Sequence, residues 1–530
     1  MSALTGTRTL VRFALRRDRV RLPTWIAAIT ALMAVSAASV VGLYTTEAEL
    51  LTYSRLVQGN AAMVVQAGPG FGLDEPTTGA IVVNEALLWG VVAVGLMGVF
   101  AVARHTRAEE ETGRAELLRA TVVGRDAPAA ATAVVVALAD LAVGALVALA
   151  LVVLGLPVAG SIALGAALAA AGAVFAAVTA VAAQVTTTAR GAIGIGVGAI
   201  GVSFVLRAIG DVRGGPLSWF SPIGWAHRVR PFADEQWWVL GLAVAVAAAL
   251  TGLAFALTAR RDLGAGLLSE QPGPAEPAEW LLSPLGLAVR LQRGALIGWV
   301  SGLAVLGAFY GVVGDEAEQM IADNPDLADF FAQLGSGSVV DAFFATGLLM
   351  LALMASGFTV SSVLRLRSEE TAGRADPLLA GVVPRRRWMA SHLVVALVGS
   401  LLVVGAGGVG AGAGYAIVTG DASQVARLLG AALVHLPAVA VLGALTVALF
   451  GLIPRWALLG WAGVAVAVVV GIFGELLQLP DAVRAVSPFE HAPALPAAEL
   501  DLMPLAVTAA VALALGAAGF LGFRARDVDL

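Results

Sequence analysis

Residues 127–155 read APAAATAVVVALADLAVGALVALALVVLG, an apolar run in which Asp140 is the one charged residue. A helix needs about 20 apolar residues to cross a hydrocarbon core about 30 Å thick, and this run is longer. Similar blocks recur along the rest of the chain, without the strict alternation of a half-buried strand. The sequence therefore predicts a series of membrane-spanning helices.

The overall composition supports the same prediction. Of 530 residues, 59% are hydrophobic and 13% are charged, and the mean hydropathy is +0.89. Soluble domains carry about 25% charged residues. We therefore expect an all-α polytopic membrane protein with about twelve transmembrane helices. The candidate spans are 22–44, 80–103, 127–155, 160–187, 191–209, 237–259, 292–313, 340–364, 388–418, 425–453, 456–475 and 503–523.

Two residue types are missing from the sequence, and their absence excludes several kinds of site. The chain has no Cys, which excludes disulfides, iron–sulfur clusters and thiolate zinc sites. Its 32 Lys and Arg residues are all Arg, so it lacks the Lys with which a P-loop reaches the β- and γ-phosphates of a nucleotide. The five His show no ligand spacing. We predict no catalytic residue, metal, bound cofactor or nucleic-acid site in this chain.

The positions of the Arg residues predict the orientation, because cytoplasmic loops of membrane proteins are rich in Arg and Lys. Several Arg precede the first span, whose apolar stretch is longer than that of a signal peptide. Most other Arg fall on the same side, whereas segment 314–341 is acidic and lacks Arg. A Lys-free, Ala- and Gly-rich composition is typical of a GC-rich bacterial genome. We predict a multi-pass protein of the bacterial inner (plasma) membrane with both termini cytoplasmic. Segment 207–230 carries Arg on the predicted outer side, which indicates a re-entrant or interfacial segment.

An internal repeat divides the chain in two. Residues 107–125 read RAEEETGRAELLRATVVGR and residues 367–385 read RSEETAGRADPLLAGVVPR, identical at eleven of nineteen positions. Two weaker repeats are SPIGWAH at 221–227 with SPFEH at 487–491, and Arg261-Asp262 with Arg526-Asp527. We predict two fused, parallel-related halves of six helices each. They are residues 1–268, which include an N-terminal amphipathic segment, and residues 284–530, joined by a cytoplasmic linker at 269–283.

The strong repeat lies in the predicted cytoplasmic loop between the second and third span of each half. A solvated loop would explain its Arg content, but not the same acid-acid-x-x-Gly-Arg spacing in both copies. Acid and Arg residues four apart can pair along a short helix, here Glu110 with Arg114 and Glu370 with Arg374. Glycine at the third shared position permits a turn or the close approach of another surface. We predict that the loops dock a partner through their free acids. The candidate residues are Glu109, Glu110, Gly113, Arg114, Glu369, Glu370, Gly373 and Arg374.

Asp140 lies in the middle of the third candidate span, where a carboxylate is costly unless it faces protein or water. One interpretation is a polar point on a substrate path or at the interface of the halves. The other is a satisfied hydrogen bond between helices, or a protonated acid. The second half shows no clear counterpart of this residue.

Three segments carry a resemblance to a known family. They are TGTRTLVRFALRRDRVRLPTWI at 5–26, RHTRAEEETGRAELLRATVVGR at 104–125 with its second copy, and SPIGWAHRVRPFADEQWWVL at 221–240 followed by ARRDLGAGLL at 259–268. The chain resembles the permeases of ATP-binding-cassette exporters of the actinobacterial polyketide-antibiotic and multidrug type. The second half departs from the pattern around 283–299, where Arg290 and Arg293 are its only basic residues.

This resemblance implies an exporter of amphipathic or hydrophobic compounds such as antibiotics. It also implies two copies of a separate ATP-binding-cassette ATPase, which would hold ATP and Mg, and coupling through the repeated loops. One alternative is an ion-coupled secondary transporter, since such proteins also have twelve spans in two repeats. Another is a membrane-embedded enzyme of lipid or polymer assembly. The sequence does not identify the substrate.

Overall fold

The computed structural model describes residues 2–58, 61–262, 264–267, 273–322, 339–381, 383–473 and 480–526. The chain divides into two compact units, Met1–Gly273 and Pro274–Leu530. The division falls within the predicted linker 269–283, of which residues 269–272 lie outside the described residues. Over the described ranges the secondary structure is helical, without strands, and twelve helices are long and apolar enough to cross a membrane. The predicted fold class, an all-α polytopic membrane protein, is confirmed.

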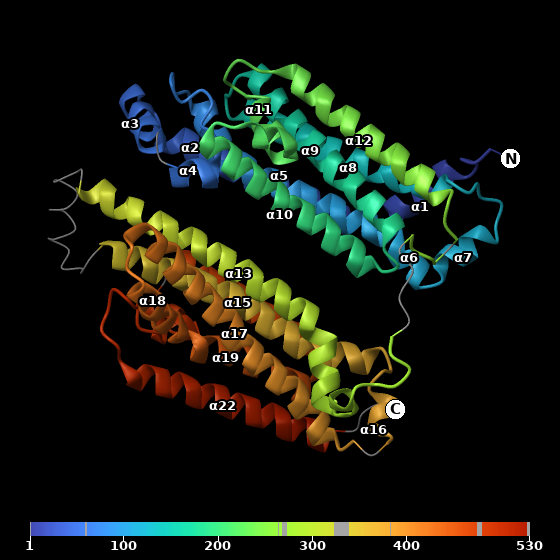
Figure 1. Cartoon of the computed structure of the whole chain (residues 1–530), viewed down its shortest axis with the longest axis vertical. Coiled ribbons are helices and arrows are strands. Elements are labelled where there is room, and N and C mark those ends of the chain that lie inside the picture. The colour runs from blue at the N-terminus through green and yellow to red at the C-terminus, as the bar shows by residue number, and fades with distance from the viewer. Residues whose placement is uncertain are drawn as a thin grey trace. The chain divides into compact units, whose positions relative to one another are not determined.

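The first unit is a bundle of long helices (Figure 1). Helices α5 and α9 form its centre, since most of their side chains are buried, whereas α2 and α12 expose most of their apolar side chains. Such exposed apolar surface is what a lipid environment accepts. The six long helices are α2 (Arg21–Leu43), α5 (Thr78–His105), α8 (Ala127–Val153), α9 (Val158–Val185), α10 (Ala189–Arg213) and α12 (Trp237–Thr258).

Small residues set the spacing of neighbouring helices in both units. A Cβ added to Gly144 of α8 would lie 2.5 Å from the backbone oxygen of Gly165 on α9. A Cβ on Gly410 would collide with the backbone oxygen of Ala304. Close backbone approach of this kind is typical of packed transmembrane helices.

The two ends of the first bundle carry different short elements (Figure 1). One end holds α1 (Thr7–Arg17), α6 (Arg107–Glu111) and α7 (Arg114–Arg119). The opposite end holds α3 (Glu47–Val57), α4 (Ala61–Ala67), η1 (Pro216–Phe220) and α11 (Pro222–Arg228). Helix α1 is amphipathic, with Leu10 and Ala14 buried, and it packs against α8, where Leu10 contacts the cluster of Ala127 and Ala131.

Segment 207–230 is folded back into the first bundle. Ile223, Trp225 and His227 of α11 are buried, and the helix contacts α5, α9 and α12. Arg207, fully buried at the end of α10, donates hydrogen bonds to the backbone oxygens of Val64 and Val65 in α4. Of the two predicted arrangements, the buried position of α11 fits the re-entrant one.

The second unit repeats the order of long helices with three differences. The predicted span 425–453 is broken into α18 and α19, because Pro437 cannot continue the α18 hydrogen-bond ladder. The predicted span 456–475 starts as the 3₁₀ helix η3. Helix α13 extends beyond the predicted 292–313 at both ends. The elements are η2 (Glu279–Leu282), α13 (Pro284–Ala322), α15 (Val339–Thr371), α16 (Asp376–Leu379), α17 (Arg385–Thr419), α18 (Ser423–Leu433), α19 (Leu436–Leu452), η3 (Pro454–Leu459), α20 (Gly460–Phe473), α21 (Asp481–Arg484), η4 (Pro488–His491) and α22 (Leu502–Ala525). Residues 323–338 of the predicted acidic outer loop lie outside the described residues.

Candidate functional site

Each repeated loop turns at its glycine. Gly113 has φ 71° and Gly373 has φ 66°, in the left-handed region that favours glycine. A Cβ on Gly113 would meet nothing within 4 Å, and one on Gly373 would make only an ordinary contact with Asp376. Both glycines therefore serve the turn, and within the described residues neither is approached closely by another segment of the chain. In the first half the turn separates α6 from α7, and in the second it follows the end of α15.

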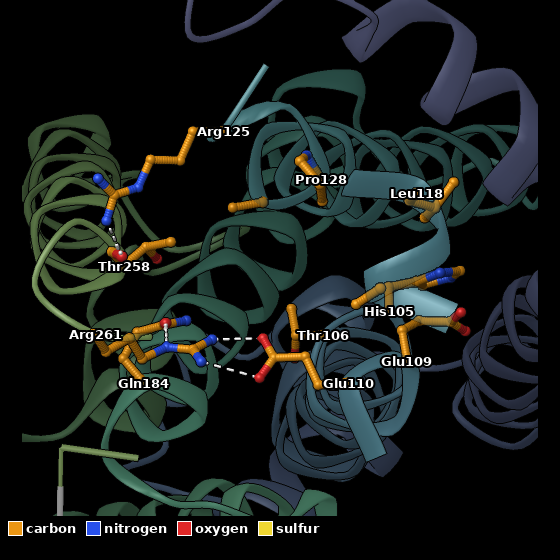
Figure 2. Close-up of a pocket in the computed structure, with 12 residues that line it drawn as sticks. His105, Thr106, Glu109, Glu110, Leu118, Arg125, Pro128, Gln184, Thr258 and Arg261 are labelled. Carbon is orange, nitrogen blue, oxygen red and sulfur yellow. Dashed lines mark hydrogen bonds and ion pairs between the residues drawn. The ribbon is translucent and has the colours of Figure 1, made fainter. Parts of the chain in front are cut away.

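The first loop is held by Glu110, but its partner is not the predicted Arg114. The Glu110 carboxylate accepts hydrogen bonds from Nη1 and Nη2 of Arg261, at 2.9 and 2.6 Å, as Figure 2 shows. Arg261 lies just beyond α12 and also donates from Nε to the side-chain oxygen of Gln184, at 2.6 Å. Arg114 is exposed. The prediction was wrong because the turn at Gly113 ends the helix between the two residues, so their spacing of four no longer places them on one helical face.

The second loop has the same arrangement. Nη2 of Arg526, just beyond α22, donates to both carboxylate oxygens of Glu370 at 2.6 and 2.7 Å. The Arg526 guanidinium also lies over the rings of Phe450 and Phe523. Arg374 contacts Glu369 at 2.8 Å and not Glu370, so this predicted pair was also wrong. The loop repeat and the Arg of the short Arg-Asp repeat thus come together as one paired unit in each half. Asp527 lies outside the described residues.

We predict from the sequence that Glu109 and Glu369 are free to face a partner. In the structure, both acids instead form ion pairs within their own half. Glu109 forms an ion pair with Arg17 at the end of α1. Glu369 is buried and pairs with Arg365 at 2.6 Å as well as with Arg374. Both acids are bound within their own half because positively charged side chains of neighbouring turns and helices converge on them.

Arg107 is a site residue that the sequence analysis did not single out. Its side chain is fully buried, donates to the backbone oxygens of Ala183 and Ala265, and contacts Glu110 at 2.8 Å. It thereby ties the first loop to the end of α9 and to the segment after α12. The available signal was its identity with Arg367 in the repeat, but Arg367 is only half-buried.

The loop residues surround a small cavity of about 80 Å³ in the first unit (Figure 2). Glu109, Glu110, Gln184 and Arg261 line it, together with His105 and Thr258. Arg125 closes the arrangement by donating to the backbone oxygen of Thr258 at 3.0 Å. The equivalent Arg385 donates to the backbone oxygen of Arg526, also at 3.0 Å. Each loop is therefore held at two points to the C-terminal end of the last long helix of its half. One point is the Glu110 or Glu370 ion pair, and the other is the hydrogen bond from Arg125 or Arg385.

Asp140 lies in the wall of a second, larger cavity of about 520 Å³. Helices α8, α9 and α12 provide most of this wall, which is otherwise largely Ala and Val. Asp140 is 2% exposed, and among the described residues neither of its carboxylate oxygens has a hydrogen-bond donor. The predicted hydrogen bond between helices is therefore wrong. A protonated acid and a polar point in the wall of the cavity both remain as interpretations.

In the part of the chain that the structure describes, twelve helices are able to span a membrane, and an ion pair holds each repeated loop to the segment after the last helix of its half. These features define a polytopic membrane protein. The chain is 40% identical to the multidrug efflux system permease protein Rv1217c of Mycobacterium tuberculosis (strain ATCC 25618 / H37Rv) over 531 residues, 99% of this chain and 96% of the relative. The family model described as multidrug efflux system permease Rv1217c, C-terminal domain, matches residues 281–524. The chain belongs to this family of multidrug efflux permeases. The expected resemblance to an exporter permease is confirmed.

Proposed function

We propose that this chain is the membrane-spanning permease subunit of an ATP-driven exporter of small amphipathic or hydrophobic compounds, drugs and antibiotics among them. The observation that carries the proposal is the ion pair formed twice, Glu110 with Arg261 and Glu370 with Arg526. Each pair links the loop after the second span of a half to the segment after its last span. A permease driven by an external motor needs such a rigid element, because it passes the motion of a loop to several helices.

The energy would come from a separate polypeptide. Since the chain has no Lys, it has no P-loop, and ATP and Mg would be held by two copies of an ATP-binding-cassette ATPase. The surface offered to such a partner is the exposed outer face of the loops and not the paired acids. In the first loop it includes Leu117 and Val122, whose side chains are 73% and 75% exposed. An apolar side chain that a partner covers can contribute 2 kcal/mol or more to association.

This proposal fixes the orientation in the bacterial plasma membrane. The loop end of each half would face the cytoplasm, where the partner hydrolyses ATP, and both chain termini would lie on that side. Thr112 and Ala372 are exposed in their loops, so Thr112→Cys and Ala372→Cys in this Cys-free chain can report accessibility. An impermeant thiol reagent should label both in inverted vesicles and neither in intact cells. Labelling in intact cells would reverse the orientation.

The subunit ratio and the energy source test the proposal directly. A tagged chain purified in mild detergent from its native host should carry an ATPase, and native mass measurement should give one permease to two ATPase chains. Proteoliposomes of the complex should move a lipophilic substrate with ATP and without an ion gradient. An ion gradient that drives transport without ATP would instead support the ion-coupled alternative, for which the buried carboxylate of Asp140 is the favouring observation.

A further inference from the structure

The cavity beside Asp140 has the dimensions of a binding site for a small molecule. Its volume of about 520 Å³ falls in the range of about 300–1,000 Å³ that is usual for such sites. The wall consists mainly of small apolar side chains from α8, α9 and α12, with α5 closing one side, and its neutral polar side chains are Thr106, Thr132, Gln184, Thr251 and Thr258. An apolar wall with few polar groups is the usual lining of a site for a hydrophobic ligand.

Within this wall Asp140 is a carboxylate without a partner among the described residues. A Cβ on Gly172 of α9 would lie 2.7 Å from Oδ1 of Asp140, so the glycine leaves the space that the carboxylate occupies. Burying an acid without a hydrogen bond or an opposite charge is unfavourable. A positively charged group in the cavity would relieve this cost.

The second half contains the same cavity in the same register. It has a volume of about 560 Å³ and lies between α15, α17, α19 and α22. At the constant offset of the loop repeat, Val136, Ala137 and Asp140 of α8 correspond to Ala396, Leu397 and Ser400 of α17. Phe255 of α12 corresponds to Phe520 of α22, as Arg261 does to Arg526. The repeat therefore extends from the loops into the walls of the two cavities.

The polar group differs between the two cavities. The Ser400 hydroxyl lies 2.6 Å from the Thr359 hydroxyl and also donates to the backbone oxygen of Ala396 at 2.6 Å. The second cavity therefore satisfies its polar groups with its own side chains and carries no charge. The first cavity has an acid in its wall whose carboxylate oxygens are buried beside Gly172 and have no partner among the described residues, so its charge would act on a ligand through the wall and not by direct contact.

We propose that the cavity of the first half binds amphipathic cations, with Asp140 as the counter-charge, and that the cavity of the second half does not discriminate in favour of cations. This inference rests on the proposed export function and names a substrate class for it. The ligand is a lipophilic cation whose charge is delocalised or shielded by apolar groups. Such a molecule matches an apolar wall with one acid.

The position of the cavity also connects it to the loop. Four residues line both this cavity and the small one at the Glu110–Arg261 pair, namely Thr106, Ala129, Gln184 and Thr258. Gln184 accepts a hydrogen bond from Arg261. A ligand in the cavity therefore touches residues that also contact the paired unit, which gives a short path from substrate binding to the loop.

Tetraphenylphosphonium is a suitable probe, since it is a lipophilic cation of compact shape. Its binding to the purified complex can be measured by equilibrium dialysis. We expect Asp140→Asn to weaken binding about tenfold or more, Asp140→Glu to retain most of it, and the matched control Ser400→Ala to leave it unchanged. Ala248→Trp, at an exposed wall residue of α12, should also block binding. It tests the cavity independently of any folding defect in Asp140→Asn.

The inference is overturned if the wild-type complex does not bind tetraphenylphosphonium, or if Asp140→Asn and Ala248→Trp bind it as tightly as the wild type. Co-purification of the ATPase should be the same in Asp140→Asn and the wild type, which shows that the variant folds and assembles. Loss of cation binding in Asp140→Asn with ATPase co-purification intact supports the site. Absence of ATPase co-purification in the wild type itself would instead contradict the proposed function.

Discussion

Glu110 and Glu370 occupy equivalent places in the two halves, and each receives an Arg from the segment beyond the last helix of its half. Asp140 and Ser400 are also equivalent, yet one is an unpaired acid and the other a hydrogen-bonded hydroxyl. The two halves therefore share the same ion pair at the loop, whereas the walls of their cavities differ in chemistry. The acid in the cavity wall belongs to the first half alone.

The loops differ in one further respect. The first is two short helices with the buried Arg107 beneath them, whereas the second continues α15 through Glu370 and has no equally buried counterpart at Arg367. The first loop is therefore tied to α9 as well as to the segment after α12. We expect the two halves to respond unequally to loss of equivalent residues.

The largest expected effect is at Arg107. Arg107→Ala would remove a fully buried guanidinium, leave the Glu110 carboxylate with one guanidinium, that of Arg261, and leave the backbone oxygen of Ala183 without its buried donor, a loss of about 3–5 kcal/mol. Arg367→Ala is the matched change in the second half and should cost about 1 kcal/mol or less. Membrane expression and thermal unfolding in detergent measure both. Equal destabilisation by the two changes would break the distinction between the loops.

The next effect concerns the paired unit that both halves share. Arg261→Gln and Arg526→Gln should each cost about 1.5–3 kcal/mol of charged hydrogen bonding, reduce ATP-driven transport tenfold or more, and preserve insertion. Arg260→Gln, at the exposed neighbour of Arg261, is the control and should have little effect. The double variant Glu110→Gln with Arg261→Gln should cost less than the sum of the two single changes, since each single change already removes the interaction between these two side chains. Additive losses would mean that the two side chains act separately.

A smaller change would make the two cavities alike. Ser400→Asp places an acid at the position equivalent to Asp140, where the Thr359 hydroxyl can donate a hydrogen bond to it. We expect the number of tetraphenylphosphonium molecules bound per chain to rise from one to two. An unchanged number would show that the acid alone does not define the cation site.

The smallest effect on folding is expected at the outer face of the loops. Leu117→Ser, at a side chain 73% exposed, should change the free energy of unfolding by no more than about 0.5 kcal/mol. It should nevertheless reduce the amount of ATPase that co-purifies, more than Pro377→Ser does at the equivalent exposed position. Undiminished ATPase recovery with Leu117→Ser would exclude this face as the docking surface.

The sequence allowed the spans to be predicted because long apolar runs have few alternatives, and the departures have local causes, such as Pro437 between α18 and α19. The partner of Glu110 could not be predicted in this way. Arg261 is 151 residues away and meets Glu110 only when α5, α9 and α12 are packed. The rule for residues four apart on a helix failed because Gly113 ends the helix first.

Asp140 is a residue whose importance was visible in the sequence but whose surroundings were not. Its chemistry was evident from the sequence, but its lack of a partner and its position in a cavity wall depend on how three helices pack. Its counterpart Ser400 was missed because the two residues are not identical, although the constant offset of the repeat leads from one to the other. The position of Ser400 relative to the loop repeat, and not its residue type, identifies it as the counterpart of Asp140.

A single polypeptide that contains both Asp140 and Ser400 is released from a constraint that governs homodimers. In a symmetric pair of six-helix subunits, any mutation in the cavity would appear in both copies at once. Here one cavity can change its preference by a single codon while the other keeps an ancestral or different one. In a fused chain the two cavities can therefore change independently, whereas in a homodimer they must stay identical. Independent change is a direct way to broaden the range of compounds that one permease handles.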